Sequence, residues 1–144
     1  MIRLSPSRGI VKATGIDFEL LSFIIGKFIP ITKKITLQVH KARNGYSYFC
    51  DYDNLIAIDI ASNKSLRETV KTILHELRHY IQTKHFKIKF TDYDDNYNAY
   101  YRSPEEIDAR SYEKLAKEVC SIYKSYVALF KKIEDLKLNC FNNN

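Results

Sequence analysis

Hydrophobic residues recur along the chain with two different spacings, one typical of helices and one typical of strands. Between Asp17 and Phe28 they recur every three or four positions, which predicts a first helix that ends before Pro30. The apolar positions on one face of this helix are Leu20, Leu21, Ile24 and Phe28. The predicted order of elements therefore begins with a helix.

Three strand-like runs follow this helix. Apolar and polar residues alternate from 35 to 40, residues 46–51 are rich in aromatic side chains, and residues 55–61 place isoleucines on one face. Asn44-Gly45 is typical of a tight hairpin turn between the first two runs, and Asp53-Asn54 predicts a turn between the second and third. The prediction is a small three-stranded antiparallel sheet.

Two helix starts come after the strands. Ser65 and Glu68 have the spacing of a capping box, and the apolar pattern that follows predicts a helix to about Lys84. Ser103 followed by proline predicts a second start and a long helix to about Lys132. The segment between these helices, residues 85–98, is predicted to hold a strand fragment and a loop that contains Asp92, Asp94 and Asp95. This order of elements is typical of an α+β domain with helices on one face of a small sheet.

The composition is that of one globular domain spanning residues 1–144, because 45% of the residues are hydrophobic and 28% are charged. The cysteines are odd in number and lack metal-like spacing, which favours free thiols in the cytoplasm. They are Cys50, Cys120 and Cys140. The N-terminus lacks the apolar segment of a signal peptide, and the most apolar stretch, residues 18–31, is too short and too charged to span a bilayer. We therefore expect a soluble cytoplasmic protein without a membrane partner.

The formal net charge is +6, and the basic residues are concentrated near the N-terminus. Residues 1–44 contain eight lysines and arginines, against Asp17 and Glu19 as the acidic residues. Such a segment can contact nucleic acid or an acidic partner. No nucleic-acid-binding motif accompanies the charge, which favours the alternative of a solvated basic surface.

The chemically informative segment is His75-Glu76-Leu77-Arg78-His79. Residues four apart share one helix face, so His75 and His79 can bind one Zn²⁺ at about 2.0–2.1 Å each. Glu76 does not point with the first histidine, and can accept a proton from a water molecule that zinc has activated. The spacing is the one that zinc-dependent hydrolysis requires on a helix. The alternative is a surface cluster that makes ordinary contacts four residues apart.

Two histidines leave a catalytic zinc site short of one protein ligand. Neither His40 nor His85 has a recognisable spacing for a third ligand, whereas Glu105 and Glu106 open the next helix. Glu106 has other possible roles, because it could complete a capping box with Ser103 or pair with an arginine four residues on. From spacing alone, the ligand and the cap stay equally open.

The two segments together resemble the gluzincin-type metallopeptidases, in particular small forms such as minigluzincins, ImmA/IrrE-like peptidases and phage-type proteins. The resemblance rests on His75 to His79 followed, after a loop, by Pro104-Glu105-Glu106-Ile107-Asp108-Ala109, and it covers about residues 35–120. It implies that Glu106 is the third zinc ligand within an E-x-x-A helix in which Ala109 is the alanine. It also implies a small antiparallel sheet whose edge strand, residues 55–61, binds extended substrate.

The chain departs from this family pattern at Arg110, where many members have an aspartate or asparagine that orients a metal-binding histidine. Asp108 or Glu105 could substitute for it. The residue that stabilises the oxyanion is also open. The candidates are Tyr100, Tyr101 and Arg102. For either tyrosine, the alternative role is aromatic packing.

The function expected from these observations is that of a zinc-dependent endopeptidase that cuts an intracellular protein or peptide, with Glu76 as general base. The family resemblance further implies a regulatory protease that cuts one target such as a repressor. The alternative from another class is a non-catalytic module that is stabilised by metal or binds nucleic acid, which the basic N-terminal third motivates. The oligomeric state is left open by the sequence.

Overall fold

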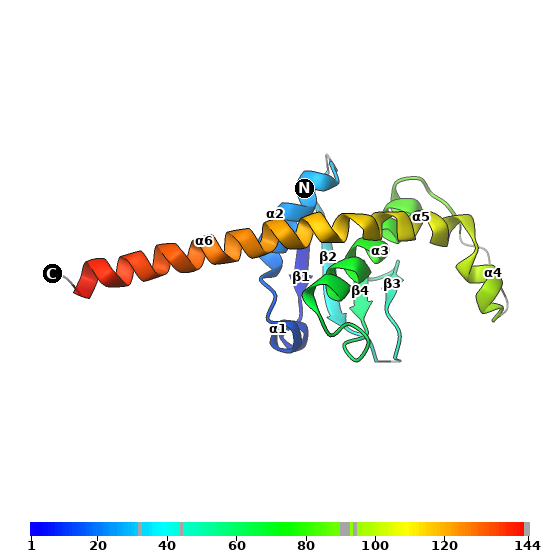
Figure 1. The fold of residues 1–144 in the computed structure, drawn as a ribbon. Helices are drawn as coiled ribbons and strands as arrows, with labels where there is room; N and C mark the ends of the chain where they lie inside the picture. Colours follow the sequence, from blue (N-terminus) through cyan, green and yellow to red (C-terminus); the bar gives the residue numbers. More distant parts are fainter. Residues whose placement is uncertain (32, 44, 90–92, 94, 143–144) are drawn as a thin grey trace.

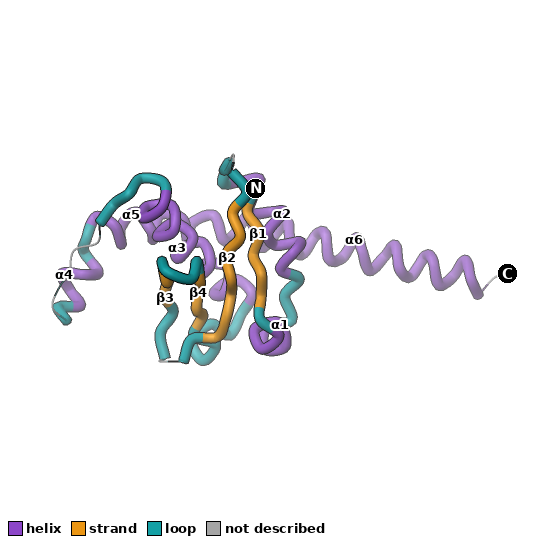
Figure 2. The backbone as a smooth tube through the Cα atoms, turned by 180° about the vertical axis from the view of Figure 1, so that it is seen from behind, coloured by secondary structure: helices purple, strands orange, loops and turns teal. Residues whose placement is uncertain are grey.

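The computed structural model describes residues 1–31, 33–43, 45–89, 93 and 95–142. In it, helices cover one face of a mixed β-sheet (Figures 1 and 2). Helices α2 (Phe18–Phe28) and α3 (Leu66–Lys84) pack on the sheet, and α6 (Ala116–Asn142) packs on both of them. This arrangement confirms the predicted α+β class.

The sheet has four strands in the order β1-β2-β4-β3, so the predicted three-stranded antiparallel sheet is wrong. Strand β1 (Ile2–Pro6) pairs in parallel with β2 (Ile35–Lys41), and β2 pairs in parallel with β4 (Leu55–Ile58). Only β3 (Tyr48–Cys50) is antiparallel to its partner β4 within the described part of the chain. Strand β1 escaped prediction because its partner lies about thirty residues away, where local periodicity carries no information.

The predicted hairpin between the first two strands is also wrong, because β2 pairs with β1 and β4 and not with β3. Asn44, on which that prediction rested, lies outside the described residues. The second predicted turn is confirmed: β3 and β4 form an antiparallel hairpin, and Asn54 has a left-handed backbone with φ 47°. Asparagine tolerates this conformation better than most residues.

The edge strand next to α3 is therefore β3 and not residues 55–61. Ile56, Ala57 and Ile58 are buried in succession, and β4 lies between β2 and β3, so it is an interior strand. The residues of β3 are half-buried, as expected of an edge strand. The prediction of one apolar strand face holds for Ile56 and Ile58, whereas Ile60 lies beyond the end of β4 and is only partly buried. The sequence could not show which strand lies beside which.

The helices agree more closely with the predictions. Helix α2 begins after Asp17, whose carboxylate accepts a hydrogen bond from the Leu20 N–H. Helix α3 begins after Ser65, whose hydroxyl accepts from the Glu68 N–H at 3.1 Å, while the Glu68 carboxylate accepts from the Lys64 N–H at 2.9 Å. Helix α1 (Arg8–Thr14) was not predicted.

The predicted single helix after Ser103 is divided into two helices. Helix α5 (Pro104–Tyr112) is followed by a 3₁₀ turn, η1 (Glu113–Leu115), before α6 begins. The described residues of 85–89 form no strand; residues 90–92 and 94, which include Asp92 and Asp94, lie outside the described residues. The segment 97–101 forms a short helix, α4 (Tyr97–Tyr101), where the sequence predicted none.

The core lies between the sheet and helices α2 and α3. Its fully buried side chains include Leu21, Ile24, Leu37, Ile56, Ile73, Leu74 and Leu77. Helix α6 joins this core through Val119 and Tyr123, and then extends away from the body of the molecule (Figure 1). Across the described chain, no helix combines the length and the apolar character that a membrane span requires.

Candidate metal centre

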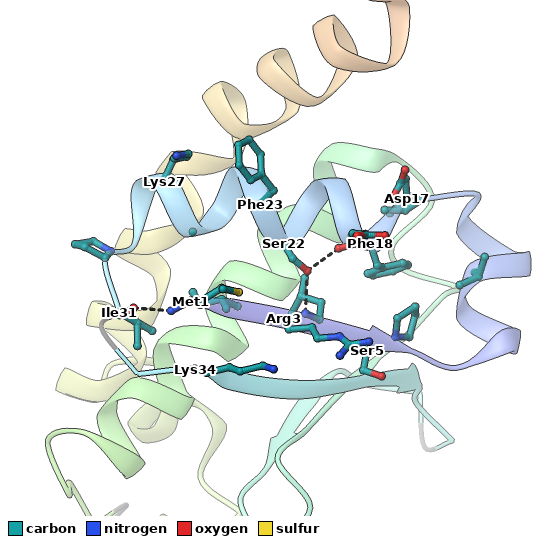
Figure 3. A pocket seen from close by; sticks show the side chains of 18 residues that line it. Met1, Arg3, Ser5, Asp17, Phe18, Ser22, Phe23, Lys27, Ile31 and Lys34 are labelled. Atoms are coloured by element: carbon teal, nitrogen blue, oxygen red, sulfur yellow. Dashed lines mark hydrogen bonds between the residues drawn. The ribbon is translucent and has the colours of Figure 1, made fainter. Parts of the chain in front are cut away.

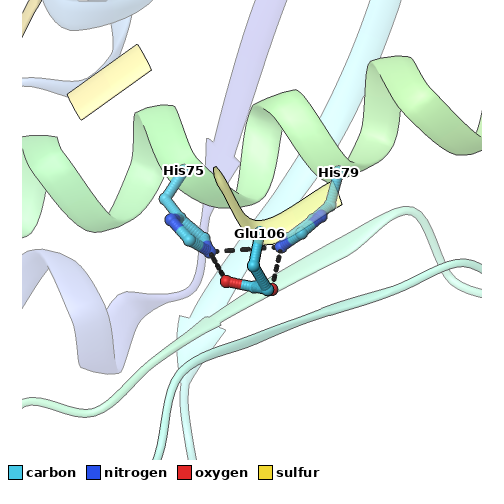
Figure 4. Close-up of side chains that lie close together, drawn as sticks. All are labelled: His75, His79 and Glu106. Atoms are coloured by element: carbon cyan, nitrogen blue, oxygen red, sulfur yellow. Dashed lines mark hydrogen bonds and ion pairs between the residues drawn. The ribbon is translucent and has the colours of Figure 1, made fainter. Parts of the chain in front are cut away.

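His75 and His79 lie on one face of α3, and Glu106 reaches them from the first turn of α5 (Figure 4). The Glu106 oxygens lie 3.1 Å from His75 Nε2 and 2.8 Å from His79 Nε2, and the two Nε2 atoms lie 3.1 Å apart. The three side chains form a cluster that could hold a metal ion. The structure thus brings together the three residues that the sequence singled out as ligands.

The start of α5 leaves the Glu106 carboxylate available for the histidines. Ser103 accepts a hydrogen bond from the Glu106 N–H at 3.3 Å, so the serine caps the helix as predicted. The Ser103 N–H, which a capping-box glutamate would bind, donates instead to the Tyr100 carbonyl at 3.0 Å. The Glu106 side chain therefore does not accept the Ser103 N–H and does not complete a capping box.

Each histidine is oriented by an acceptor on its other ring nitrogen. His75 Nδ1 lies 3.1 Å from Glu113 Oε1, and His79 Nδ1 lies 2.9 Å from Gln82 Oε1. Both partners are hydrogen-bond acceptors at these atoms, because the Gln82 amide nitrogen donates to Asp108 and to the Glu105 carbonyl. The network therefore assigns the proton of each neutral imidazole to Nδ1 and leaves a lone pair on Nε2.

The atoms at the centre of the cluster fit a cation. Two Nε2 lone pairs and the Glu106 carboxylate converge, and Glu106 Oε1 is buried without a hydrogen bond of good geometry. Electron-rich atoms in such contact repel one another unless a proton or a metal lies between them. The spacings of 2.8–3.1 Å are a few tenths shorter than the ~3.3 Å between two ligands of a tetrahedral zinc ion. The residues present therefore fit zinc with a small separation of the side chains.

The pKa values of the cluster follow from its mutual contacts. Burial lowers the pKa of His75 and His79, but the contacts with Glu106 and the negative charge of Glu76 outweigh burial and raise both pKa values above the ordinary value. Burial raises the pKa of Glu106, but the two histidines and a hydrogen bond from the Tyr100 hydroxyl lower it well below its usual range. Without metal, the cluster thus favours charged histidines beside an ionised glutamate.

Glu76 is buried beside the cluster and behaves differently from Glu106. Burial raises its pKa to about 6, although both histidines and a backbone hydrogen bond from Phe49 act to lower it. A carboxyl group with a pKa near neutrality can both accept and release a proton under physiological conditions. Glu76 is therefore chemically suited to proton transfer next to the three converging side chains.

Two residues that hold the histidines were missed by the sequence analysis. Gln82 lies three residues after His79 on the same helix, a spacing that places both side chains on one face and that could have indicated the contact. Glu113 lies seven residues after Glu106, two helical turns along, and the 3₁₀ turn holds it beside α3. At the Nδ1 atoms of His75 and His79, the orienting role expected of Asp108 or Glu105 belongs to Glu113 and Gln82 instead.

Asp108 and Arg110 have other partners. Asp108 accepts hydrogen bonds from Arg78 Nε at 2.7 Å and from Gln82 Nε2 at 2.7 Å, so it supports His79 indirectly through Gln82. The Arg110 guanidinium stacks on Tyr101 with 3.8 Å between its central carbon and the ring centroid. One nitrogen of Arg110 also lies 4.0 Å from the Glu106 carboxylate.

A cavity of about 630 Å³ opens onto this cluster, and Glu76, His79 and Glu106 are among its lining residues. Of the three oxyanion candidates, Tyr100 lines the cavity, whereas Tyr101 and Arg102 do not. A larger cavity of about 1060 Å³ lies between β1 and α2, and its lining residues all come from the first 34 positions of the chain (Figure 3). There Ser22 accepts a hydrogen bond from the Leu4 N–H at 2.8 Å, which satisfies part of the edge of β1.

His40 in β2 and His85 at the end of α3 lie outside the ligand cluster, as the sequence predicted. No protein-family model matches the chain, and comparisons with characterised proteins and with solved structures likewise find no significant match. A proposal of function therefore depends on the arrangement of His75, His79 and Glu106 in this structure.

Proposed function

We propose that the chain is a zinc-dependent endopeptidase that hydrolyses peptide bonds of a protein or peptide. The observation that carries the proposal is the convergence of His75, His79 and Glu106 at 2.8–3.1 Å, beside buried Glu76 and at the wall of a cavity. Two imidazoles and one carboxylate are the ligand set of catalytic zinc sites that keep one position open.

Glu76 is the general base of the proposed reaction. The oxygen of a water molecule attacks the carbonyl carbon of the peptide while Glu76 accepts a proton from that water. As the C–N bond breaks, the same carboxyl group passes the proton to the leaving amine and returns to its ionised form. Burial raises the pKa of Glu76 to about 6 in the metal-free site, and the positive charge of bound zinc would act in the opposite direction, so the group would be ionised at neutral pH and able to accept a proton.

The other residues of the site bind the metal ion, orient its ligands or contact the substrate. His75, His79 and Glu106 would bind zinc, while Glu113 and Gln82 fix the ring positions of the histidines. When bound, zinc would supply the Lewis acidity that makes water a nucleophile near neutral pH. Tyr100 lines the cavity and is the candidate hydrogen-bond donor for the oxyanion.

The substrate would lie along β3. This strand is the edge of the sheet on the side of α3, and Tyr48 and Phe49 contribute to the cavity wall. An extended peptide can add to such an edge through backbone hydrogen bonds. The proposed substrate is thus an extended segment of polypeptide, which explains why the cavity and the sheet edge adjoin.

Metal analysis of purified protein and two glutamate variants test the proposal. We expect about one zinc per chain, and we expect Glu76→Gln to keep zinc and to lose turnover by about 10²–10⁴-fold. Glu106→Gln should weaken zinc binding by at least about 10–100-fold, because even residues that only orient ligands have effects of that size. Glu105→Gln is the matched control and should keep zinc.

Three outcomes would contradict parts of the proposal. Loss of zinc from Glu105→Gln but not from Glu106→Gln would show that Glu105 is the third ligand and that the assignment of Glu106 is wrong. Retention of zinc by both variants would show that neither glutamate is a zinc ligand, and it would contradict the gluzincin interpretation of this helix. Stoichiometric zinc without hydrolysis of any peptide would instead favour a metal-stabilised module, and salt-dependent binding of nucleic acid unaffected by Glu76→Gln would favour a nucleic-acid-binding one.

A further inference from the structure

Five of the residues that line the cavity beside the candidate metal centre are tyrosines, and they come from two separate segments. Tyr46 and Tyr48, at and before the start of β3, have ring centroids 6.2 Å apart. Tyr93, Tyr97 and Tyr100 come from α4 and the segment before it, and the centroids of Tyr93 and Tyr97 lie 6.4 Å and 6.5 Å from that of Tyr100. The cavity is therefore walled by aromatic rings on residues that are far apart in the sequence.

Several of these rings are accessible although they are large and apolar. Tyr46 is 62% exposed and Tyr97 is 68% exposed. Exposed aromatic side chains grouped around a cavity mark a binding surface more often than scattered single ones do. The ring faces carry a negative electrostatic potential, which attracts cations placed over them.

The carboxylates at the cavity outnumber the basic groups, because His79 is the one residue of the described lining that can carry a positive charge. The chain has 23 lysines and arginines, yet none is among the residues that line this cavity, whereas Glu76, Glu105 and Glu106 are. A bound divalent zinc would balance Glu76 and Glu106 and would leave Glu105 as the uncompensated charge. Within the described part of the chain, Glu105 forms no ion pair, and its carboxylate accepts a hydrogen bond from the Tyr93 hydroxyl at 3.5 Å.

We propose that this cavity selects a substrate residue with a cationic side chain, arginine or lysine, which lies between the tyrosine rings with its charge toward Glu105. The inference rests on the proposed function, since it names the side chain that the peptide carries next to the cleaved bond. A guanidinium group stacks on aromatic rings and binds carboxylates in the same plane, so arginine suits this lining better than lysine.

Other side chains fit the cavity less well. An aspartate or glutamate would face Glu105 and the ring faces, which repel negative charge. An aliphatic side chain would bury apolar surface against the tyrosines but would leave the charge of Glu105 without an ion pair. The combination of aromatic walls with a carboxylate that forms no ion pair in the described residues therefore favours a cation over either alternative.

Peptide binding can be measured without turnover by using the zinc-loaded Glu76→Gln variant. The probes are blocked pentapeptides Ala-Ala-Xaa-Ala-Ala in which Xaa is arginine, lysine, glutamine or glutamate, titrated by calorimetry. We expect the arginine peptide to bind about tenfold more tightly than the glutamine peptide, from one partly exposed ion pair and stacking on tyrosine. The glutamate peptide should bind most weakly.

Added substitutions identify the residues responsible. Glu105→Gln should reduce the preference for arginine over glutamine to about threefold, and Tyr97→Leu should reduce it by a similar factor. The matched controls are Glu118→Gln, an exposed acid on α6, and Tyr52→Leu, a tyrosine that is 98% exposed and lies outside the cavity. Neither control should change the preference.

The results separate this inference from the proposed function. Equal binding of all four peptides, or a preference for arginine that Glu105→Gln leaves at its full size, overturns the inference. Cleavage of the series by the wild-type protein without such a preference leaves the peptidase proposal in place and overturns only the inference. A preference for arginine without cleavage of any peptide supports the binding site and contradicts the peptidase proposal.

Discussion

Glu113 and Gln82 hold equivalent nitrogens of the two histidines, but only Glu113 carries a charge. A carboxylate makes the imidazole that it binds more basic and more electron-rich than an amide does. Glu113 also lies 3.9 Å from Lys71, a contact between partly exposed groups that contributes little. At the scale of single residues, the two candidate ligands are thus held in one orientation but are electronically unequal.

This inequality predicts a graded effect of substitutions at Glu113. Glu113→Gln keeps an acceptor for His75 Nδ1 and should weaken zinc binding by about tenfold at most, whereas Glu113→Ala removes the acceptor and should weaken it by about 10–100-fold. Competition with a chelator of known zinc affinity measures both. Glu118→Ala, which removes an exposed acid on α6, is the control. Equal zinc affinity of Glu113→Ala and this control would show that Glu113 has no part in metal binding.

At the scale of elements, the metal centre joins α3 to the first turn of α5. Each of these helices is capped by a serine, Ser65 for α3 and Ser103 for α5. Ser65 caps the turn that begins ten residues before His75, whereas Ser103 binds the backbone N–H of Glu106 itself. The two serine hydroxyls therefore accept equivalent hydrogen bonds but differ in their distance from the ligands.

The two serines provide a matched pair of variants. Ser65→Ala and Ser103→Ala should each lower the free energy of unfolding by about 1 kcal/mol, the usual cost of losing an N-cap. Only Ser103→Ala should also weaken zinc binding, because it loosens the turn that carries Glu106. Denaturant unfolding and zinc titration measure the two effects. If zinc affinity fell equally in both variants, the position of the cap would not matter, and the link between the α5 cap and the centre would be refuted.

At the scale of the whole molecule, protons and zinc compete for the same site. The pKa values of His75 and His79 are raised in the folded protein, so their contribution to stability without metal is fully present below about pH 6.5 and is lost as the pH rises through the raised values. Glu76, Glu106 and Glu113 are the acidic groups that face the two histidines. The lowered pKa of Glu106 contributes stability above about pH 4.3, the ordinary value, and this contribution is lost only as the pH falls below it.

Zinc binding has the opposite dependence on pH, because it requires neutral imidazoles. Zinc should therefore raise the melting temperature more at pH 7.5 than at pH 5.5, since protons occupy the histidines at the lower pH. Thermal unfolding with zinc or with chelator at both pH values measures this difference. Identical melting temperatures in all four conditions, or a larger effect of zinc at pH 5.5, would contradict a site built on the two histidines.

The sequence by itself determined the features that depend on near neighbours. Helix α3 with its serine cap, the shared face of His75 and His79, and the turn at Asn54 all follow from interactions within a few residues. Local periodicity likewise placed Ile56 and Ile58 on one strand, and the mixture of helices and strands that it predicted is the α+β class. The prediction that Glu106 is the carboxylate beside the histidines depended on the family resemblance as well, because spacing alone also allowed a role as helix cap.

Only the tertiary structure decided how distant segments meet. Strand β1 joins a parallel partner about thirty residues away, and Glu113 reaches His75 from the 3₁₀ turn η1, in a later part of the chain. Strand neighbours are chosen by pairing of backbone groups and by burial over the whole sheet, and neither is encoded in any short window of sequence. The tyrosine-lined cavity likewise depends on the tertiary structure, because its rings come from segments that meet only when β3 and α4 lie beside the first turn of α5.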